Sequence, residues 1–344
     1  MTEIAVRTPL QRRSLGRRVL SVLLWLLTLL LVLCQATIWY GPLSPWPAAL
    51  DQFAVQLAGL AAIVAVLALL LRRWARLAVL VVLIATFSWP IFSHRGAAAA
   101  VVDPARLKIL SANVWHSAAG HDRTIAALMA SDADIVGLVE VTPDWRRPLA
   151  PLIAKYPYHV DCFDVDPECQ IIVLSKLPIA QPYAGRVWRA TPIVAGGEVM
   201  WNGRPITVLA THLFRPLARS DESMWGEEDS KFSAYLADHL PLSRQAGQAG
   251  RFAKYLNSLP GDLIVMGDFN SAPWGRVQHA FRAKTGLDNQ AGWDFSWPSW
   301  LYRPLRLPLD HVLTRGHLVV TAFSAGPETD SDHLPVIAEI GWRD

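Results

Sequence analysis

Three long apolar runs near the start of the chain constrain its fold more than any other feature of the sequence. They cover Val19–Tyr40, Ala54–Leu71 and Leu77–Phe92, and none of them contains a charged residue. A helix that spans a bilayer needs about 20 apolar residues. The first two runs meet this requirement, and the third does so with a residue or two from its flanks. We therefore expect residues 19–92 to form a three-helix transmembrane anchor rather than a buried helical hairpin of a soluble protein.

Arginines around these runs predict the orientation of the anchor. They are plentiful before the first run and between the second and third runs, whereas residues 41–53 contain no Lys or Arg. Basic residues collect in short cytoplasmic loops. Residues 1–18 are thus predicted to be a basic cytoplasmic N-terminus, and everything after about residue 95 to lie outside the cytoplasm. This places the protein in the cell (inner) membrane as a multi-pass protein with a periplasmic or extracellular domain.

The first run is predicted to stay in the protein as an anchor. It is longer than the apolar core of a signal peptide, and no convincing cleavage site follows it. Four aromatic residues fall near the predicted outer boundary of the membrane, where such rings are favoured: Trp39, Tyr40, Trp46 and Trp89. The lipid bilayer is therefore a predicted partner.

Composition divides the chain at the end of the anchor. Of its 344 residues 52% are hydrophobic and only 18% charged, which excludes a disordered chain. Residues 1–102 carry a formal charge of +7, whereas residues 103–344 carry −4. A domain that binds duplex DNA is usually basic, because Lys and Arg side chains that neutralise the DNA phosphates supply much of the affinity. The charge of the second part therefore argues against a nucleic-acid partner, although a local basic patch would escape this count.

A short tether, residues 93–105, leads into one α/β domain over residues 106–344. Apolar runs typical of strands alternate there with helical patterns, and no internal repeat is apparent. The predicted strands are 107–115, 132–141, 169–176, 204–214, 262–270, 311–316, 317–326 and 334–342. The predicted helices are Thr124–Ala130, Pro143–Tyr156 with Thr142 as N-cap, and Arg244–Leu259.

Two of the three cysteines lie close together in this domain. Cys162 and Cys169 flank the segment FDVDPE, and Cys34 lies in the first apolar run. A disulfide between Cys162 and Cys169 suits an oxidising compartment. The alternative is a pair of unbonded thiols.

Polar residues with chemical potential gather where the predicted strands end. They are Asn113, Glu140, His212, Asp268, Asn270, Asp310, Asp332 and His333. If these strands share a sheet, their ends converge on one cleft. Oxygen ligands of this kind suit Mg²⁺, which combines one or two carboxylates with waters and phosphate oxygens. The chain has no H-E-x-x-H motif and few cysteines, so a zinc site is not expected.

Six short motifs follow one another in a recognisable order. They are NVW at 113–115, GLVEV at 137–141, THL at 211–213, GDFN at 267–270, LDHV at 309–312 and SDHLPV at 331–336. In this order the chain resembles the endonuclease/exonuclease/phosphatase superfamily over about residues 106–342. With its anchor it is similar to the membrane-anchored bacterial members of the YafD and VanJ type. The resemblance implies a DNase I-like four-layer α/β sandwich, in which two sheets pack between helices.

The resemblance also implies a role for each strand-end residue. Glu140 would be the chief Mg²⁺ ligand, with Asn113 and Asp332 completing the metal site and Mn²⁺ as an alternative ion. His333 would be the general base that activates water, and Asp310 would orient it. The other three would hold the nucleophile and the scissile phosphate: Asp268, Asn270 and His212. Val139 stands where many members have Gln, which alters the surroundings of Glu140.

Several further residues carry weaker signals. His116, His121 and His311 are taken as incidental, although His116 falls near the mouth of the site. The acidic stretch Asp221–Asp229 is either a solvated loop or a lid. The three tryptophans of WDFSWPSW are packing residues, cleft residues or residues that enter the bilayer surface: Trp293, Trp297 and Trp300.

The sequence therefore predicts a membrane-anchored, Mg²⁺-dependent phosphoesterase. It would hydrolyse a phosphate ester or pyrophosphate, preferably of a lipid, by attack of water activated by His333. A phosphorylated small molecule is a second class of substrate. The alternatives are an extracytoplasmic nuclease and a non-catalytic membrane binding protein. The sequence indicates no oligomeric state.

Overall fold

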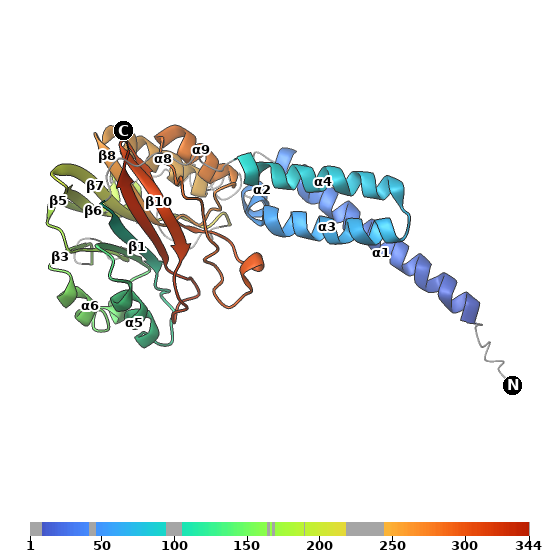
Figure 1. The fold of residues 1–344 in the computed structure, drawn as a ribbon, viewed down its shortest axis with the longest axis horizontal. Helices are drawn as coiled ribbons and strands as arrows, with labels where there is room; N and C mark the ends of the chain where they lie inside the picture. The colour runs from blue at the N-terminus through green and yellow to red at the C-terminus, as the bar shows by residue number, and fades with distance from the viewer. Residues whose placement is uncertain are drawn as a thin grey trace, which may run out of the picture.

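The computed structural model describes residues 9–40, 46–93, 105–163, 166, 169–188, 190–217 and 244–343. Within them a helical bundle leads into a sandwich of two β-sheets, and the bundle extends away from one side of the sandwich (Figure 1). The predicted tether beyond Ser93 and the acidic stretch Asp221–Asp229 lie outside the described residues, so both remain predictions.

The N-terminal bundle contains three helical segments long and apolar enough to cross a membrane, Arg18–Trp39, Trp46–Leu70 and Trp74–Phe92. This confirms the three helices expected from the apolar runs, and the third begins earlier than expected. The elements are α1 (Pro9–Tyr40), α2 (Trp46–Leu50), η1 (Asp51–Phe53), α3 (Ala54–Leu70) and α4 (Trp74–Ser93).

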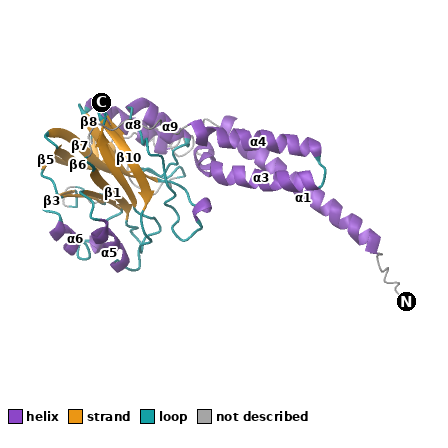
Figure 2. Cartoon of the chain, viewed as in Figure 1, coloured by secondary structure: helices purple, strands orange, loops and turns teal. Residues whose placement is uncertain are grey.

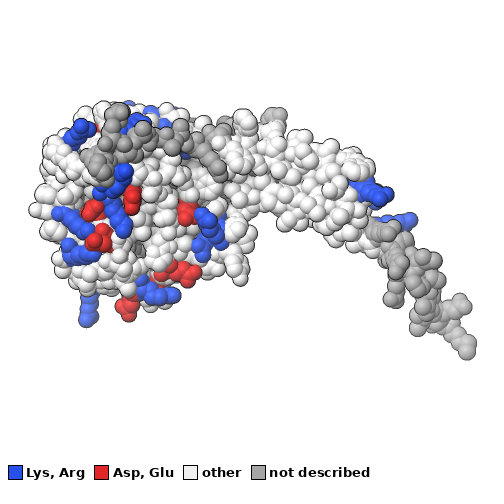
Figure 3. Space-filling model, viewed as in Figure 1, with Lys and Arg blue, Asp and Glu red and all other residues white. Residues whose placement is uncertain are grey.

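The bundle is apolar both inside and outside. Leu31, Val64 and Leu80 form part of its core, while Val66 and Val82 face outward and are exposed. In the view of Figure 3, charged side chains cover the sandwich, and the described surface of the bundle shows them only at its far end. A helical surface of this kind suits a lipid environment.

The first sheet has six strands in the order β10-β11-β1-β2-β4-β3, and only β1 and β2 pair in parallel. Helices α5 (Asp122–Ser131) and α6 (Ala150–Lys155) cover its outer face through contacts with Leu110 and Val136. The strands are β1 (Leu107–Asn113), β2 (Ile135–Val139), β3 (Tyr158–Asp161), β4 (Ile171–Ser175), β10 (Leu318–Ala325) and β11 (Val336–Trp342).

The second sheet has five strands in the order β5-β6-β7-β8-β9, and only β7 and β8 pair in parallel. Helices α8 (Arg244–Ser258) and α9 (Arg276–Thr285) cover its outer face, where Phe252 and Phe281 pack against Leu209 and Val265. The strands are β5 (Ile179–Val187), β6 (Ala190–Trp201), β7 (Arg204–His212), β8 (Asp262–Asp268) and β9 (Asp310–Arg315).

A continuous apolar core joins the inner faces of the two sheets. Ile109 and Val173 of the first sheet belong to the same buried cluster as Val208, Ile264 and Met266 of the second. Side chains alternate between this core and the helix-covered faces because successive strand residues point to opposite sides. The result is a four-layer sandwich with helices outside both sheets (Figure 2), as the sequence predicts.

The structure also departs from the expected elements. The helix predicted over Pro143–Tyr156 is divided into η2 (Pro143–Trp145) and α6, because Pro148 lacks the N–H that a continuous helix would use, and the Thr142 side chain makes no cap. The short patterns of β3, β5, β6 and α9 gave no clear signal in the sequence. Cys162 and Cys169 form the predicted disulfide, with their Cα atoms 5.6 Å apart.

Candidate active site

The predicted site residues meet where corresponding ends of the two sheets come together. Asn113 ends β1, and Glu140 follows the parallel neighbour β2. His212 and Asp268 end the parallel strands β7 and β8 in direct register, and Asp310 begins β9 opposite Asp268. Parallel neighbours bring the residues at their carboxyl ends to one edge, so each sheet contributes one half of the site.

Glu140 is held as an ionised carboxylate on the first-sheet side. Its Oε1 accepts a hydrogen bond from Asn113 Nδ2 at 2.8 Å, and its Oε2 lies 3.0 Å from the His116 backbone N and 2.6 Å from His116 Nδ1. Burial raises the pKa of Glu140, but the positive charge of His212 and these hydrogen bonds outweigh it and lower the pKa to about 2. The residue also has a φ of 61°, a strained left-handed conformation of the kind found at functional sites.

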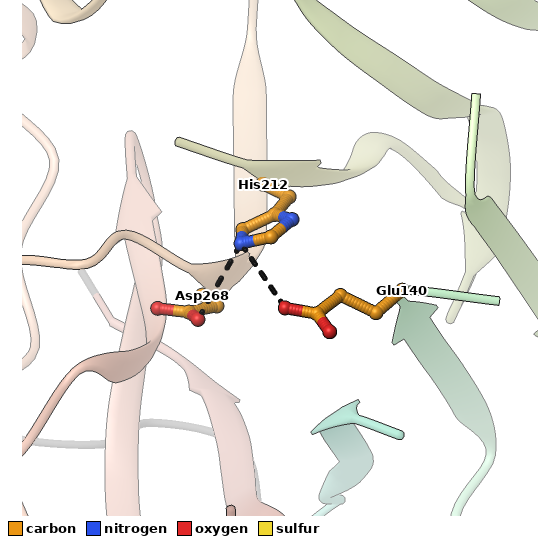
Figure 4. Close-up of side chains that lie close together, drawn as sticks. All are labelled: Glu140, His212 and Asp268. Carbon is orange, nitrogen blue, oxygen red and sulfur yellow. Dashed lines mark ion pairs between the residues drawn. The ribbon is translucent and has the colours of Figure 1, made fainter. Parts of the chain in front are cut away.

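His212 lies between Glu140 and Asp268 (Figure 4). Its Nε2 is 3.8 Å from Glu140 Oε1 and 3.6 Å from Asp268 Oδ2. Burial lowers the pKa of His212, whereas the hydrogen bond and charge of Asp268 and the charge of Glu140 raise it above its ordinary value. Asn113 Nδ2 also donates to Asp268 Oδ2 at 3.1 Å, so one amide bridges the two carboxylates.

Asn270 is fixed by the turn that follows β8. Its backbone N donates to Asp268 Oδ1 at 2.7 Å, its Nδ2 donates to the Leu213 carbonyl at 2.8 Å, and that Nδ2 lies 3.1 Å from His212 Nε2. The preceding Gly267 has a φ of 141°, and a Cβ there would lie 1.8 Å from the Thr211 carbonyl oxygen. Only glycine allows β7 and β8 to approach so closely, which explains the first residue of the GDFN motif.

His333 and Asp310 form a buried pair. His333 Nδ1 lies 2.7 Å from Asp310 Oδ2, and its Nε2 lies 3.7 Å from Asp268 Oδ2. Burial lowers the pKa of His333, but Asp310 and Asp268 reverse this and raise it to about 10. Because the carboxylate accepts from Nδ1, the ring directs Nε2 toward Asp268 and the other site residues.

Asp332 points to a different neighbour from the other predicted metal ligands. Its Oδ2 accepts a hydrogen bond from Trp297 Nε1 at 3.0 Å, and its Oδ1 is buried without a hydrogen-bond partner. Asn113 turns its amide nitrogen toward Glu140 and Asp268, while its Oδ1 accepts from the Trp115 backbone N. In this geometry Asn113 positions carboxylates, and Asp332 retains one free acceptor.

The donor set fits a divalent cation. Among the described residues, Glu140, His212 and Asp268 offer ligand atoms that all lie within 4.8 Å of one another. The pKa values of Glu140 and Asp268 are both lowered to about 2: burial opposes this, but histidine charges and hydrogen bonds prevail. Two ionised carboxylates are the hard oxygen donors that Mg²⁺ and Mn²⁺ favour.

The sequence missed the contribution of three side chains near the site. His116, taken as incidental, binds Glu140 through both its backbone and its ring. Trp297 binds Asp332, and its ring centroid lies 6.3 Å from that of His333. His311, also taken as incidental, is buried and donates from Nε2 to the Ser271 carbonyl at 2.8 Å. Its position directly after the NVW motif is the sequence feature that indicates that His116 lies near the site.

The loop after β8 also contacts the N-terminal bundle. The Ala272 backbone N donates to Gln52 Oε1 at 2.5 Å, and Trp274 Nε1 donates to the Asp51 carbonyl at 3.0 Å. The Arg276 backbone N donates to Asp51 Oδ2 at 2.9 Å. This loop begins at Asn270, so polar groups of the bundle hold the segment that carries a site residue.

The sequence pattern of the Endonuclease/Exonuclease/phosphatase family matches residues 110–333. The chain belongs to this family. The matched segment runs from β1 to His333 and contains all eight predicted site residues. This family generally depends on divalent metal ions.

Individual proteins are similar to parts of this chain. The inositol phosphosphingolipids phospholipase C of Saccharomyces cerevisiae is 26% identical over 182 residues, which is 48% of this chain and 34% of that protein. The chain thus spans about a third of the length of this curated relative. A conserved protein of unknown function from Enterococcus faecalis has a similar structure, with a TM-score of 0.50, 14% identity, and coverage of 69% of this chain and 100% of that one. An endonuclease/exonuclease/phosphatase from Beutenbergia cavernae has a TM-score of 0.49 and 17% identity, with 69% and 72% covered.

Proposed function

We propose that this protein is a membrane-anchored, Mg²⁺-dependent phosphoesterase that hydrolyses a phosphoester of a lipid outside the cytoplasm. The contact between the bundle and the loop of Asn270 carries this proposal. Asp51 and Gln52 lie near the start of Trp46–Leu70, one of the three candidate membrane-spanning segments, and both bind that loop directly. An active site attached in this way stays beside the membrane surface.

Three observations favour a lipid substrate. The charge of −4 over residues 103–344 does not suit a nucleic-acid backbone. A relative detected by sequence is named a phospholipase C for inositol phosphosphingolipids. Attachment to a membrane raises the effective concentration of a substrate in the same membrane without any additional contact. Phospholipids and polyprenyl phosphates or pyrophosphates are the classes that this reasoning favours, ahead of soluble phosphate esters.

Glu140 and Asp268 would hold the Mg²⁺ ion, with the free oxygen of Asp332 as a third donor and Asn113 keeping the two carboxylates in place. The ion would neutralise charge that develops on the phosphate oxygens. Mn²⁺ would serve the same ligands. His212 and Asn270 would donate hydrogen bonds to the phosphate, because their Nε2 and Nδ2 atoms face the same space between the sheets.

Asp310 and Asp268 raise the pKa of His333, and the positive charge of a bound Mg²⁺ would lower it again, so that the neutral ring could accept the proton of the attacking water through Nε2. Asp310 holds the opposite ring nitrogen at 2.7 Å, which fixes the orientation of the ring and stabilises its protonated form. Asp268, 3.7 Å from Nε2, would orient the water beside this nitrogen. We propose direct in-line attack by this water on phosphorus, with no covalent intermediate.

A hydrolysis screen on the full-length protein in lipid nanodiscs tests the proposal, with released phosphate measured for monoesters and pyrophosphates and the separated products measured for diesters and DNA. The panel holds lipid phosphates, lipid pyrophosphates, phosphosphingolipid diesters, soluble phosphate esters and DNA, each with Mg²⁺, with Mn²⁺ and with chelator, and His333→Ala is the control. We expect Mg²⁺-dependent cleavage of a lipid substrate by the wild type only. Cleavage of DNA in preference to every lipid would replace the proposal with the nuclease alternative, and equal activity of His333→Ala would exclude the mechanism.

A further inference from the structure

The segment between α9 and β9 forms a closed loop. An antiparallel bridge between Trp297 and Leu307 closes it, with Trp297 N 3.0 Å from Leu307 O. Arg306 crosses its interior and donates from Nε to the Leu301 carbonyl at 2.7 Å and from Nη2 to the Ser299 carbonyl at 2.5 Å. We call this segment loop 297–307. These internal hydrogen bonds give it a defined shape.

Loop 297–307 presents large apolar side chains outward. Trp300 is 68% exposed, Tyr302 is 84% exposed and Leu305 is 51% exposed. An ordered loop that turns its polar groups inward and three large apolar groups outward is unfavourable in water. Grouped exposed apolar side chains of this kind mark an interaction surface.

The loop touches the start of a membrane-spanning helix. Gln56, in the first turn of α3, donates from Nε2 to the carbonyls of Pro304 at 3.1 Å and Arg306 at 3.0 Å. Figure 1 shows the loop beside the end of the bundle that joins the sandwich. The level of this first turn in the bilayer therefore sets the level of the loop.

The length of α3 places that first turn at the membrane boundary. The candidate span Trp46–Leu70 includes α2 and η1, but Asp51 and Gln52 near its start bind the sandwich domain, so the part that is free to cross the hydrocarbon begins with α3. α3 has 17 residues. At about 1.5 Å per residue it is about 25 Å long, which is less than the roughly 30 Å of hydrocarbon that it must cross. All of α3 is then needed to span the bilayer, and a loop bound to its first turn lies at head-group level.

We propose that loop 297–307 is a membrane-interface element whose Trp300, Tyr302 and Leu305 side chains enter the head-group region of the bilayer that the bundle crosses. This inference rests on the proposed membrane anchoring. Trp and Tyr favour the interface because one end of each ring system is apolar and the other forms hydrogen bonds. Exposed Trp39 and Trp89 near the same ends of α1 and α4 would occupy the same level.

The charges of the loop favour the apolar part of the interface over anionic lipid. Arg303 forms an ion pair with Asp294 at 2.8 Å, and Arg306 is used by the carbonyls inside the loop. The loop would therefore bind a zwitterionic bilayer as well as an anionic one, since no unpaired cation drives the contact.

The base of the loop reaches the active site. Trp297 binds the Asp332 carboxylate, and the Ser299 backbone N donates to the Asp332 carbonyl at 2.7 Å. A loop seated among head groups would thus keep Asp332 and His333 at the height of lipid phosphates. The substrate class that follows is a phosphoester in the head-group layer of the same leaflet, rather than one that must leave the membrane.

Fluorophore quenching by spin-labelled lipid tests the position of the loop without requiring catalysis. In a Cys34→Ala background, which keeps the Cys162–Cys169 disulfide, Tyr302→Cys is labelled with an environment-sensitive dye and the full chain is placed in phosphatidylcholine vesicles. Tyr158→Cys, on β3 at the far side of the sandwich (Figure 1), is the control in water, and Trp39→Cys on α1 is the control in the membrane.

We expect the dye at 302 to be quenched and blue-shifted like that at 39, with the dye at 158 unaffected. The same result with and without anionic lipid would support the apolar mode of contact. Quenching at 39 but not at 302 would overturn the inference and leave the anchor in place. Absence of quenching at both sites would overturn the anchoring itself and the inference with it.

Discussion

The two halves of the active site differ in how firmly they are held. The half formed by Asp268, Asp310 and His333 is buried, with Asp268 1%, Asp310 0% and His333 5% exposed, and the bundle supports the loops next to Asp268 and Asp310 through Gln52 and Gln56. The half around Glu140 is more open: the Glu140 side chain is 15% exposed, the His212 ring 30% and the His116 ring 56%. The hydrogen bonds of Gln52 and Gln56, like that of Asp51, go to segments next to the second sheet, on the side of the buried half.

This difference matches the tasks of the two halves. A proton-transfer pair such as His333–Asp310 depends on fixed geometry and a low dielectric constant, both of which burial supplies. A metal ion and its waters must reach their ligands from solvent, and the exposed side of Glu140 provides that access. Under the proposed mechanism the site thus combines a rigid half for proton transfer with an open half for the ion, and the bundle stabilises the rigid one.

The largest predicted effect is on the buried half. Replacing His333 by Ala removes the group that accepts the proton, so kcat should fall by about 10³-fold, within the range of general bases. Hydrolysis of the substrate found in the screen measures this. His317→Ala changes an exposed histidine and is the matched control. A loss smaller than about tenfold would mean that the buried pair is not the proton-transfer unit.

Substitutions in the open half should change the Mg²⁺ concentration that the enzyme needs for activity. Glu140→Gln keeps the shape of the side chain but removes its charge, so the Mg²⁺ concentration for half-maximal activity should rise roughly 100-fold. His116→Ala, which removes one hydrogen bond to Oε2, should raise it by roughly tenfold. Mg²⁺ titration of the rate, together with calorimetry of Mg²⁺ binding, measures both. Unchanged Mg²⁺ binding in Glu140→Gln would locate the ion elsewhere.

Lowering the pH should reduce the free energy of unfolding through His311, which is buried. Burial lowers the pKa of His311 to about 4, from an ordinary value of about 6.5. Between these two pH values the unfolded chain binds a proton that the folded protein does not. The free energy of unfolding should then fall as pH falls through this window, by about 1.4 kcal/mol per pH unit, and His311 should contribute no slope above it.

Thermal unfolding in detergent between pH 7.5 and 4.5 measures this contribution as the difference in slope between wild type and His311→Asn. The variant keeps a polar side chain near the Ser271 carbonyl but does not titrate. Parallel curves for the two proteins would show that His311 is not the group responsible.

The support from the bundle should have a moderate effect. Gln52→Leu leaves the buried Ala272 N–H without an acceptor, which costs about 1–3 kcal/mol. Activity on a water-soluble substrate should fall as the loop of Asn270 loosens, even though membrane attachment is not needed for that substrate. Gln52→Glu retains the acceptor and should restore activity. Equal losses in both variants would indicate a folding defect rather than a loss of loop position.

Much of the arrangement of the candidate site could be predicted from the sequence. Glu140 and Asp268 end apolar runs and Asp310 lies next to one, so strand prediction places all three at strand ends, although it does not indicate in which sheet each lies. The apolar runs likewise predicted the three long helices of the bundle. GDFN and SDHLPV then suggested which polar residues belong together.

The support for these residues could not be predicted, because it depends on distant contacts. Gln52 and Ala272 are 220 positions apart, and nothing in WPAALDQF indicates that its last polar residues bind a catalytic loop. The hydrogen bond from Trp297 to Asp332 similarly crosses 35 positions. His116 is the exception among these supporting contacts, because its position directly after NVW indicates that it lies near Glu140.

The smallest predicted effect concerns the loop before His333 on the first-sheet side. Arg123 Nε of α5 lies 2.7 Å from Asp330 Oδ1, and the Arg123 side chain is 70% exposed. An ion pair so open to water contributes about 0.5 kcal/mol. Arg123→Ala should therefore lower the free energy of unfolding by about that amount and leave kcat nearly unchanged, because the Ser331 hydroxyl, which donates to the Asn113 carbonyl at 2.7 Å, still holds the loop. Denaturant unfolding and steady-state rates measure both quantities. If Arg123→Ala instead lowered activity as much as Gln52→Leu, the buried half would depend on the first sheet as much as on the bundle, and the special support from the bundle would not hold.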